Sequence, residues 1–380
     1  MRLLLVALLL SVAVPVTADH VQEISWACGP GGSGREGHPD RCGIDPIGGD
    51  GVGRDADAVW GDAWVADDAL VLGVEVRGDA VAVPVVLLNR HEIANVEVGG
   101  LPVAITYCPL CGSGVTFERT LFVGGTTQTL DFAASGFLFQ HDLVMWDSQT
   151  GTLWNQILGE PIGTLRDRHV AGDHPEARLQ VVPTALTTWG EWRQAHPESP
   201  MLQGVPGARY QSAYAGYDGS CRFGISAHSD CDVDGLHPKE LVVGVVGPRG
   251  DLAVPRFAIT DVHVANEHGL VVVNDGPDVR AYDVGRHAFN RTSEGWVDEA
   301  GQPWNLTHGL RADGGASLQP LTPLTMYWFA WQEHHPGTQL WVPADADGAL
   351  ALHDNGRLPG FTIGVVAVLL VAIALLLRRR

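Results

Sequence analysis

Two cysteines three residues apart are the residues of this chain whose types and spacing point most directly to chemistry. They lie in the run Tyr107-Cys108-Pro109-Leu110-Cys111-Gly112. Thiols at this spacing can hold a soft metal ion, or they can cycle between a dithiol and a disulfide. Cys108 and Cys111 are therefore candidate metal ligands and candidate redox residues.

The sequence on either side places this pair at the tip of a β-hairpin. Residues 101–107 and 115–119 are rich in apolar and β-branched side chains and predict two strands. A helix after the second cysteine is typical of thioredoxin-like enzymes, and none is predicted here. The turn resembles the knuckle of rubredoxins and zinc ribbons, in which the glycine lets backbone amides point at the sulfurs. A site with four thiolates needs a second knuckle, and the sequence has none.

A metal ion at this knuckle would therefore need histidine or carboxylate ligands as well. The candidate histidines are His91, His228 and His237. Thiolate and imidazole together favour zinc or copper over magnesium or calcium. The alternatives are a thiol pair that cycles in redox chemistry, a strained local disulfide, and two inert thiols.

The other four cysteines form two candidate local disulfides, Cys28 with Cys42 and Cys221 with Cys231. Such bonds persist outside the cytoplasm. Asn290 and Asn305 begin N-x-T sequons and are candidate glycosylation sites.

Both ends of the chain predict an extracytoplasmic protein at the cell surface. Residues 1–18 have the basic start, apolar run and small-residue end of a secretory signal peptide. Residues 361–377 form an apolar run that ends in three arginines, which the positive-inside rule places in the cytoplasm. The sequence thus predicts that the C-terminal segment anchors the body to a membrane. An ordinary tail anchor and a processed sorting signal are the two alternatives for it.

The composition is strongly acidic, with 44 acidic against 24 basic residues and a net charge of −20. Lys239 is the one lysine of the chain. Such a charge is typical of a surface solvated for high salt, and it argues against nucleic acid as a partner. The sequence has no nucleophile elbow, phosphate-binding loop, paired-histidine protease motif or nucleotide fingerprint. Hydrolase and kinase activity are therefore unsupported, and whether the protein is an enzyme stays open.

Short apolar or alternating runs separated by Gly- and Asp-rich turns predict a mainly β fold with a few short helices. Examples are residues 80–88, 127–132, 143–146, 241–246 and 270–273. Three segments, 84–95, 147–155 and 189–197, return in the same order at 255–266, 298–305 and 328–336, which predicts two duplicated β-rich halves. The expected organisation is a signal peptide at 1–18, a flexible leader at 19–58, a first half at 59–235, a second and degenerate half at 236–345, a linker at 346–357 and an anchor or sorting signal at 358–380.

The third repeated segment predicts a short helix in each half. Thr188 and Glu191 form a capping box for the first, and Thr322-Pro323 is a favourable start for the second. Two tryptophans and a histidine then share one face of each helix, and we expect the indoles to pack against a sheet.

Several spaced motifs together resemble the family labelled domain of unknown function 3179. They include residues 91–95, 99–112, 135–139, 142–154, 236–240 and the closing 328–336, so the resemblance spans roughly residues 81–341. It makes His237 the best choice among the histidines, and it implies no established activity. His141 departs from the family, which usually has a small polar residue there. The last 23 residues resemble the PGF-type sorting signal of haloarchaeal surface proteins, which implies processing by an archaeosortase.

The sequence thus predicts a membrane-anchored surface protein that binds zinc or copper, or cycles a thiol pair, at the Cys108–Cys111 knuckle. The alternative is a non-catalytic surface or adhesion module in which the two cysteines are a structural staple. Gln156 and Trp154 follow a turn and are expected near the same face, with core packing the simpler account of the tryptophan.

Overall fold

The computed structural model describes residues 25–26, 44, 46–48, 57–123, 125–164, 177–204, 210, 214–225 and 229–341. The predicted signal peptide and anchor, Cys28, Cys42 and His228 lie outside these residues. Within them, no helix combines the length and the apolar character needed to cross a bilayer. The mainly β fold with a few short helices is confirmed.

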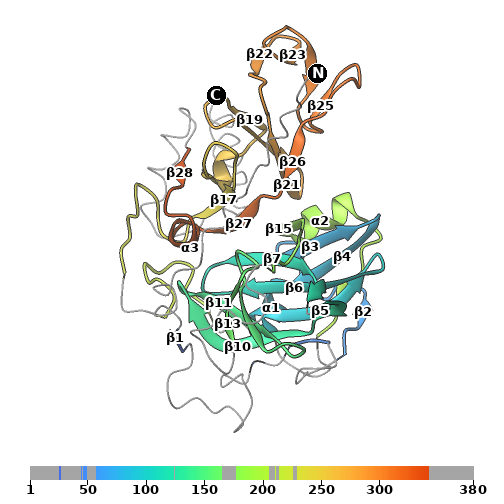
Figure 1. Cartoon of the computed structure of the whole chain (residues 1–380), viewed down its shortest axis with the longest axis vertical. Coiled ribbons are helices and arrows are strands. Elements are labelled where there is room, and N and C mark those ends of the chain that lie inside the picture. The colour runs from blue at the N-terminus through green and yellow to red at the C-terminus, as the bar shows by residue number, and fades with distance from the viewer. Residues whose placement is uncertain are drawn as a thin grey trace, which may run out of the picture.

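The N-terminal part of the described chain forms three larger sheets and one hairpin (Figure 1). The first sheet has the order β1 (Ser25–Trp26), β10 (Phe132–Phe139), β11 (Asp142–Asp147), β12 (Thr152–Asn155) and β13 (Pro161–Thr164). The second has the order β14 (Val181–Val182), β7 (Ser113–Glu118), β6 (Leu101–Cys108) and β5 (Ile93–Val98). The third has the order β15 (Thr184–Thr188), β3 (Leu70–Val76), β4 (Asp79–Pro84), β16 (Met201–Leu202) and β2 (Trp60–Gly61), and the hairpin is β8 (Thr120–Val123) with β9 (Thr126–Thr129).

The C-terminal part forms three four-stranded sheets. The first has the order β27 (Leu324–Tyr327), β17 (Leu241–Val245), β18 (Leu252–Pro255) and β28 (Gln339–Leu340). The second has the order β19 (Val262–Ala265), β20 (Leu270–Asp275), β21 (Asp278–Asp283) and β26 (Gln319–Leu321). The third has the order β22 (Asn290–Thr292), β23 (Gly295–Val297), β24 (Pro303–Asn305) and β25 (Leu310–Arg311). Figure 1 shows β17, β27 and α3 (Trp328–His334) between the blue-to-green sheets and the orange strands β19–β26.

Two expected local structures are wrong. The apolar run 80–88 is a strand only as far as Pro84, and α1 (Val85–His91) follows it, because a short apolar run does not itself distinguish strand from helix. Thr322-Pro323 does not start the helix before the closing tryptophans. The intervening residues pair with β17 as strand β27, so sheet pairing overrides the local start signal and α3 begins at Trp328.

The two tryptophan helices pack in the same way. In α2 (Trp189–Ala195), Thr188 and Glu191 form the predicted capping box, and the Trp192 indole covers Gly73 of β3. In α3 the Trp331 indole covers Gly244 of β17. Each indole lies against the ring of the histidine that follows its helix, with ring centroids 4.1 Å apart in the first case and 3.8 Å in the second.

Two further contacts recur in the same order along the chain. The side chain of Asn95 exchanges two hydrogen bonds with the backbone of Phe132, and Asn266 does the same with Phe289. An aspartate accepts the indole N–H of a nearby tryptophan in both parts, and these pairs are Asp147 with Trp154 and Asp298 with Trp304. These contacts agree with a duplication, which stays a prediction.

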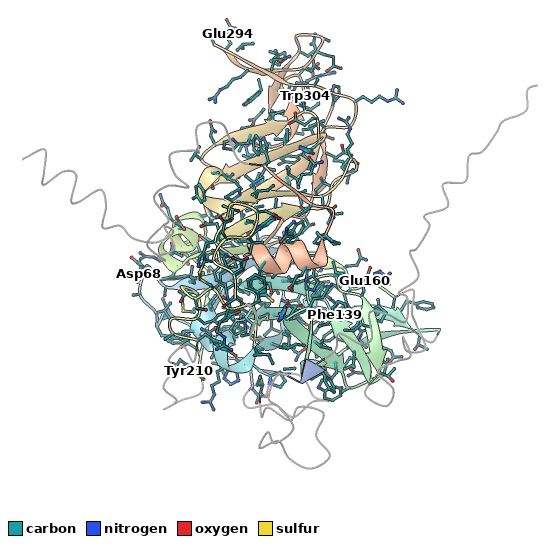
Figure 2. All side chains as sticks on the ribbon, turned by 90° about the vertical axis from the view of Figure 1, so that its left-hand side faces the viewer. Asp68, Phe139, Glu160, Tyr210, Glu294 and Trp304 are labelled. Carbon is teal, nitrogen blue, oxygen red and sulfur yellow. A yellow bond between two sulfur atoms is a disulfide. The ribbon has the colours of Figure 1, made fainter. Side chains whose placement is uncertain are left out.

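The β10–β11 hairpin is buried on both faces and separates two clusters of apolar side chains. Phe132, Leu143 and Met145 face the largest cluster, and Phe139 and Val144 face another, as the two-residue period of a strand requires. Figure 2 shows Phe139 beneath α3, where its ring lies 6.1 Å from that of His334. Glu294 and Trp304 are at the far end of the molecule (Figure 2).

The largest apolar cluster is shared by both parts of the chain. Cys108, Phe117 and Trp154 from the N-terminal part lie in it together with Val242 and Trp328 from the C-terminal part. The walls of the cysteine turn therefore come from segments far apart in sequence.

Candidate metal centre

The two cysteines lie at the tip of the β6–β7 hairpin, as predicted. Cys108 pairs with Ser113 across the strands, and the Cys111 amide donates to the Cys108 carbonyl over 3.2 Å. Both side chains are free thiols and are buried, with 2% and 0% of their surfaces exposed. The knuckle is thus an interior feature of the protein.

Gly112 closes this turn because no other residue fits its backbone and surroundings. Its φ of 60° is in the left-handed region, and a Cβ there would lie 2.9 Å from the Tyr327 ring. The Tyr327 amide donates to the Cys111 carbonyl over 2.8 Å. The Tyr217 hydroxyl donates to the Leu110 carbonyl over 2.8 Å. Strand β27 and the loop containing Tyr217 therefore hold the turn in place.

A carboxylate completes the group. Asp142, the first residue of β11, is 0% exposed, and its ligand atom and the sulfurs of Cys108 and Cys111 all lie within 4.8 Å of one another. The turn before it is Gln140-His141, with φ of 48° and 64°, the backbone of a two-residue hairpin loop. Asn, Asp and Gly enter that region at least cost, so His141 is an uncommon residue for this turn.

Sequence reasoning missed Asp142. The residue stood in a run that carried the family resemblance, but nothing in its spacing from Cys111 linked the two. One signal could have found it: a charged residue begins β11, a strand that is buried along its whole length, and charged side chains are rarely buried without a partner.

Burial decides the protonation of this group. It raises the pKa of both thiols, that of Cys111 more strongly because its hydrogen bond with Cys108 adds to the effect. Burial also raises the pKa of the Asp142 carboxyl to about 7, and hydrogen bonds from the two thiols and Ser113 oppose that rise. Both thiols are therefore protonated at neutral pH, and a bound cation would displace their protons.

A polar network lies beside the three ligand atoms. The Ser113 hydroxyl is 2.9 Å from the Gln156 side-chain oxygen and 3.4 Å from Asp142 Oδ1. The Gln156 amide donates to the Thr106 hydroxyl over 2.9 Å. Gln156 thus lies near the cysteines, as expected, and it orients Ser113. Trp154 packs in the core and donates to Asp147 over 2.9 Å.

His141 contributes its backbone to the site. Its carbonyl accepts from the Cys111 thiol over 3.4 Å, while its ring is directed to Glu333 of α3, with Nδ1 2.9 Å from Oε2. The imidazole is therefore engaged in a contact between the two parts of the chain.

The one lysine is also buried near the turn. Lys239 is 0% exposed, its Nζ lies 3.4 Å from the centroid of the Tyr217 ring, and it donates to the Arg222 carbonyl. The rings of Tyr327 and Phe329 lie 5.5 and 5.0 Å from the same nitrogen. Burial lowers the pKa of Lys239 to about 7. The cation–π contacts partly replace the water that the ammonium has lost.

The predicted histidine ligands are not brought into this group. His237 is half-buried in the loop before β17, where its Nδ1 accepts from the Lys239 amide over 3.1 Å. His91 is buried at the end of α1, with Nε2 3.5 Å from the Tyr210 hydroxyl. Among the described residues, Asp142 is the one that lies with the two cysteines as a possible metal ligand, and neither of these histidines does.

The remaining predicted residues lie elsewhere. Cys221 and Cys231 form the expected disulfide, which closes the loop that leads to Lys239. Asn290 and Asn305 are exposed on β22 and β24.

Comparison with known proteins places the chain in a family. The model of the family described as protein of unknown function (DUF3179) matches residues 54–338. No curated protein and no solved structure matches the chain. The match includes β6, the turn that follows it and β11, which supply Cys108, Cys111 and Asp142. Since it covers well over half of the sequence, this chain belongs to the DUF3179 family of proteins of unknown function.

Proposed function

We propose that the protein binds one soft metal ion, preferentially zinc, through Cys108, Cys111 and Asp142. The observation that carries this proposal is the convergence of three buried ligand atoms within 4.8 Å of one another. Zinc bonds of about 2.0 to 2.3 Å place neighbouring ligand atoms at separations of this order.

The chemistry of the three side chains favours zinc over the harder divalent cations. Two thiolates exclude magnesium and calcium as preferred ions, and a carboxylate is a poorer ligand for copper(I) than for zinc. The polar network of Ser113 and Gln156 supports the ligands from outside, as in other metal sites. Three protein ligands would leave a fourth position for water or another small ligand.

Thiol redox cycling is the second candidate. Asp142, with a pKa of about 7, could accept a proton from a neighbouring thiol. The burial of both sulfurs argues against this role, because it raises their pKa and keeps a protein disulfide from reaching them. A structural staple remains the non-catalytic alternative.

The setting of the site belongs to the same proposal. The signal-like residues 1–18 and the apolar run 361–377 support a body outside the cytoplasm that is anchored at the surface through its C-terminus. The resemblance of the last residues to a PGF-type signal supports processing by an archaeosortase. In an oxidising compartment, a bound metal would also protect the two thiols from oxidation.

The test is elemental analysis of residues 19–355, purified in high salt under reducing conditions. We expect close to one equivalent of zinc or copper in the wild type and none in Cys108→Ser/Cys111→Ser. Asp142→Asn keeps the size of the side chain and should weaken zinc binding by about tenfold or more. Asp278→Asn, a half-buried aspartate on β21, should retain the metal in full.

Cobalt loading provides an independent readout, because thiolate ligands give cobalt a strong near-ultraviolet charge-transfer absorption. Its absence, together with two titratable thiols before and after zinc loading, would rule out the metal site. Reversible disulfide formation between Cys108 and Cys111 at a defined potential would then favour the redox alternative.

A further inference from the structure

A cleft of 790 Å³ lies next to the cysteine turn and belongs to neither the metal ligands nor their supporting network. Tyr107, Pro109 and Gly112 at the cysteine turn line it, but neither cysteine does. Its walls come from the start of α2, residues 214–218, the start of β17 and the helical turn η2 (Arg256–Ala258). Both parts of the chain therefore build it, and its size suits a small organic ligand.

Several aromatic rings line this cleft. The lining includes the aromatic side chains of Tyr107, Tyr214, Tyr217, Phe257 and Tyr327. The Tyr214 and Tyr217 rings meet edge to face, with centroids 6.4 Å apart. Tyr217 already carries one cation on its ring, the ammonium of Lys239. Electron-rich rings of this kind attract cations and the polarised C–H groups attached to them.

The charges of the lining are mostly negative. Five carboxylates line the cleft, and these are Asp67, Asp68, Glu191, Asp218 and Glu240. Among the described lining residues, Arg256 is the one basic side chain. It faces Glu191, whose carboxylate is also held by Thr187 and Thr188, so this part of the lining is internally compensated.

Glu240 is the one buried carboxylate among the described lining residues. It is 5% exposed and lines the cleft, and within the described residues its carboxyl group makes no hydrogen bond and no ion pair. A buried carboxylate without a partner costs several kcal/mol, so such a group is rarely kept unless something pairs with it.

We propose that this cleft binds a small organic cation, a protonated amine or a quaternary ammonium group, whose charge pairs with Glu240 and whose alkyl groups contact the tyrosine rings. The carboxylate supplies the counter-charge and the rings supply a surface that water wets poorly. The proposal is independent of metal binding, because no metal ligand lines the cleft.

Titration calorimetry of residues 19–355 with choline, and with its uncharged carbon isostere dimethylbutanol, tests the proposal directly. The two probes have nearly the same shape, so a preference for choline reports the charge. We expect choline to bind at least about tenfold more tightly than the alcohol. Equal binding of the two would reduce the cleft to an apolar cavity, and no binding of choline would overturn the proposal.

Variants assign the effect to its residues. Glu240→Gln should lower choline affinity by at least about tenfold and leave binding of the alcohol unchanged. Tyr214→Phe keeps the ring and should bind choline, whereas Tyr214→Leu should lose most of the affinity. Glu267→Gln, an exposed carboxamide substitution outside the cleft, is the matched control. Unchanged choline binding in Glu240→Gln would contradict the assignment, and zinc content measured on the same samples keeps the two sites separate.

Discussion

At the scale of single residues, three buried ionisable side chains near the cysteine turn have strongly shifted pKa values. Burial brings the pKa of Asp142, Lys239 and Glu240 to about 7 in each case, from opposite directions for the acids and the amine. Asp142 has the thiols and Lys239 has aromatic rings as neighbours. Glu240 lines the cleft and belongs to neither of these groups of contacts, so its effect on the protein can be tested separately.

Glu240→Gln should stabilise the protein in a pH-dependent way. The pKa of Glu240 is raised in the folded state from 4.5 to about 7, so the native protein favours the protonated form. Its contribution to stability is full below about pH 4.5 and is lost as the pH rises through 7. The variant should therefore exceed the wild type by up to about 3 kcal/mol at pH 8 and match it near pH 4.5. Urea unfolding at both pH values, in one salt, measures the difference.

A variant that is less stable than the wild type at pH 8 would contradict this account. It would show that the Glu240 carboxylate has a partner in the folded protein. Glu267→Gln serves as the control, and its difference from the wild type should not depend on pH.

At the scale of elements, a short helix covers a glycine of a neighbouring strand in each part of the chain. An indole lies over Gly73 in β3 and another over Gly244 in β17. The absence of a side chain at these two positions lets each helix approach its sheet closely. The equivalent fit in two places is an observation that sequence similarity alone could not provide.

Gly73→Ala and Gly244→Ala should each destabilise the protein by about 1–3 kcal/mol, the usual effect of overpacking a close-packed core. The added Cβ would lie 2.3 Å from the Trp192 ring in the first variant and 2.2 Å from the Trp331 ring in the second. Gly337→Ala, where a Cβ meets no atom within 4 Å, is the control and should change little. Thermal unfolding of the three variants gives the comparison. Wild-type stability in either core variant would mean that the helix shifts without cost.

At the scale of the whole molecule, the two parts of the chain form one core around the cysteine turn. The Phe329 ring of α3 stacks on Phe223 with centroids 4.9 Å apart, and Tyr327 covers the turn. The candidate metal ligands come from the N-terminal part, while the C-terminal part supplies a wall and the buried lysine. The two parts should therefore depend on each other.

A fragment that ends at residue 235 should fail to fold into a soluble, metal-competent protein. Removing the C-terminal part would uncover Phe223 and the cysteine turn, and exposed apolar surface of this kind promotes aggregation. Size-exclusion chromatography and zinc content of this fragment, alone and co-expressed with residues 236–355, measure the effect. A monomeric fragment with one equivalent of zinc would instead define two independent domains.

Much of this architecture follows from the sequence alone. Period-two apolar runs and turn residues predict the strands, and the capping box at Thr188 and Glu191 predicts α2, because these signals act between near neighbours in the chain. The hairpin around Cys108 and Cys111 and the disulfide between Cys221 and Cys231 follow from local spacing in the same way.

Only the tertiary structure decided what surrounds the cysteines. Asp142 lies 31 residues after Cys111 in the sequence and is brought to it by the packing of two different sheets, which no local sequence pattern encodes. The same holds for β27, whose pairing with β17 overrides the helix start at Thr322. The burial that raises the pKa of the thiols depends on residues of both parts of the chain. The sequence by itself therefore determined which residues could do chemistry, and the packing of distant segments determined their protonation and partners, because desolvation and long-range contacts exist only in the folded chain.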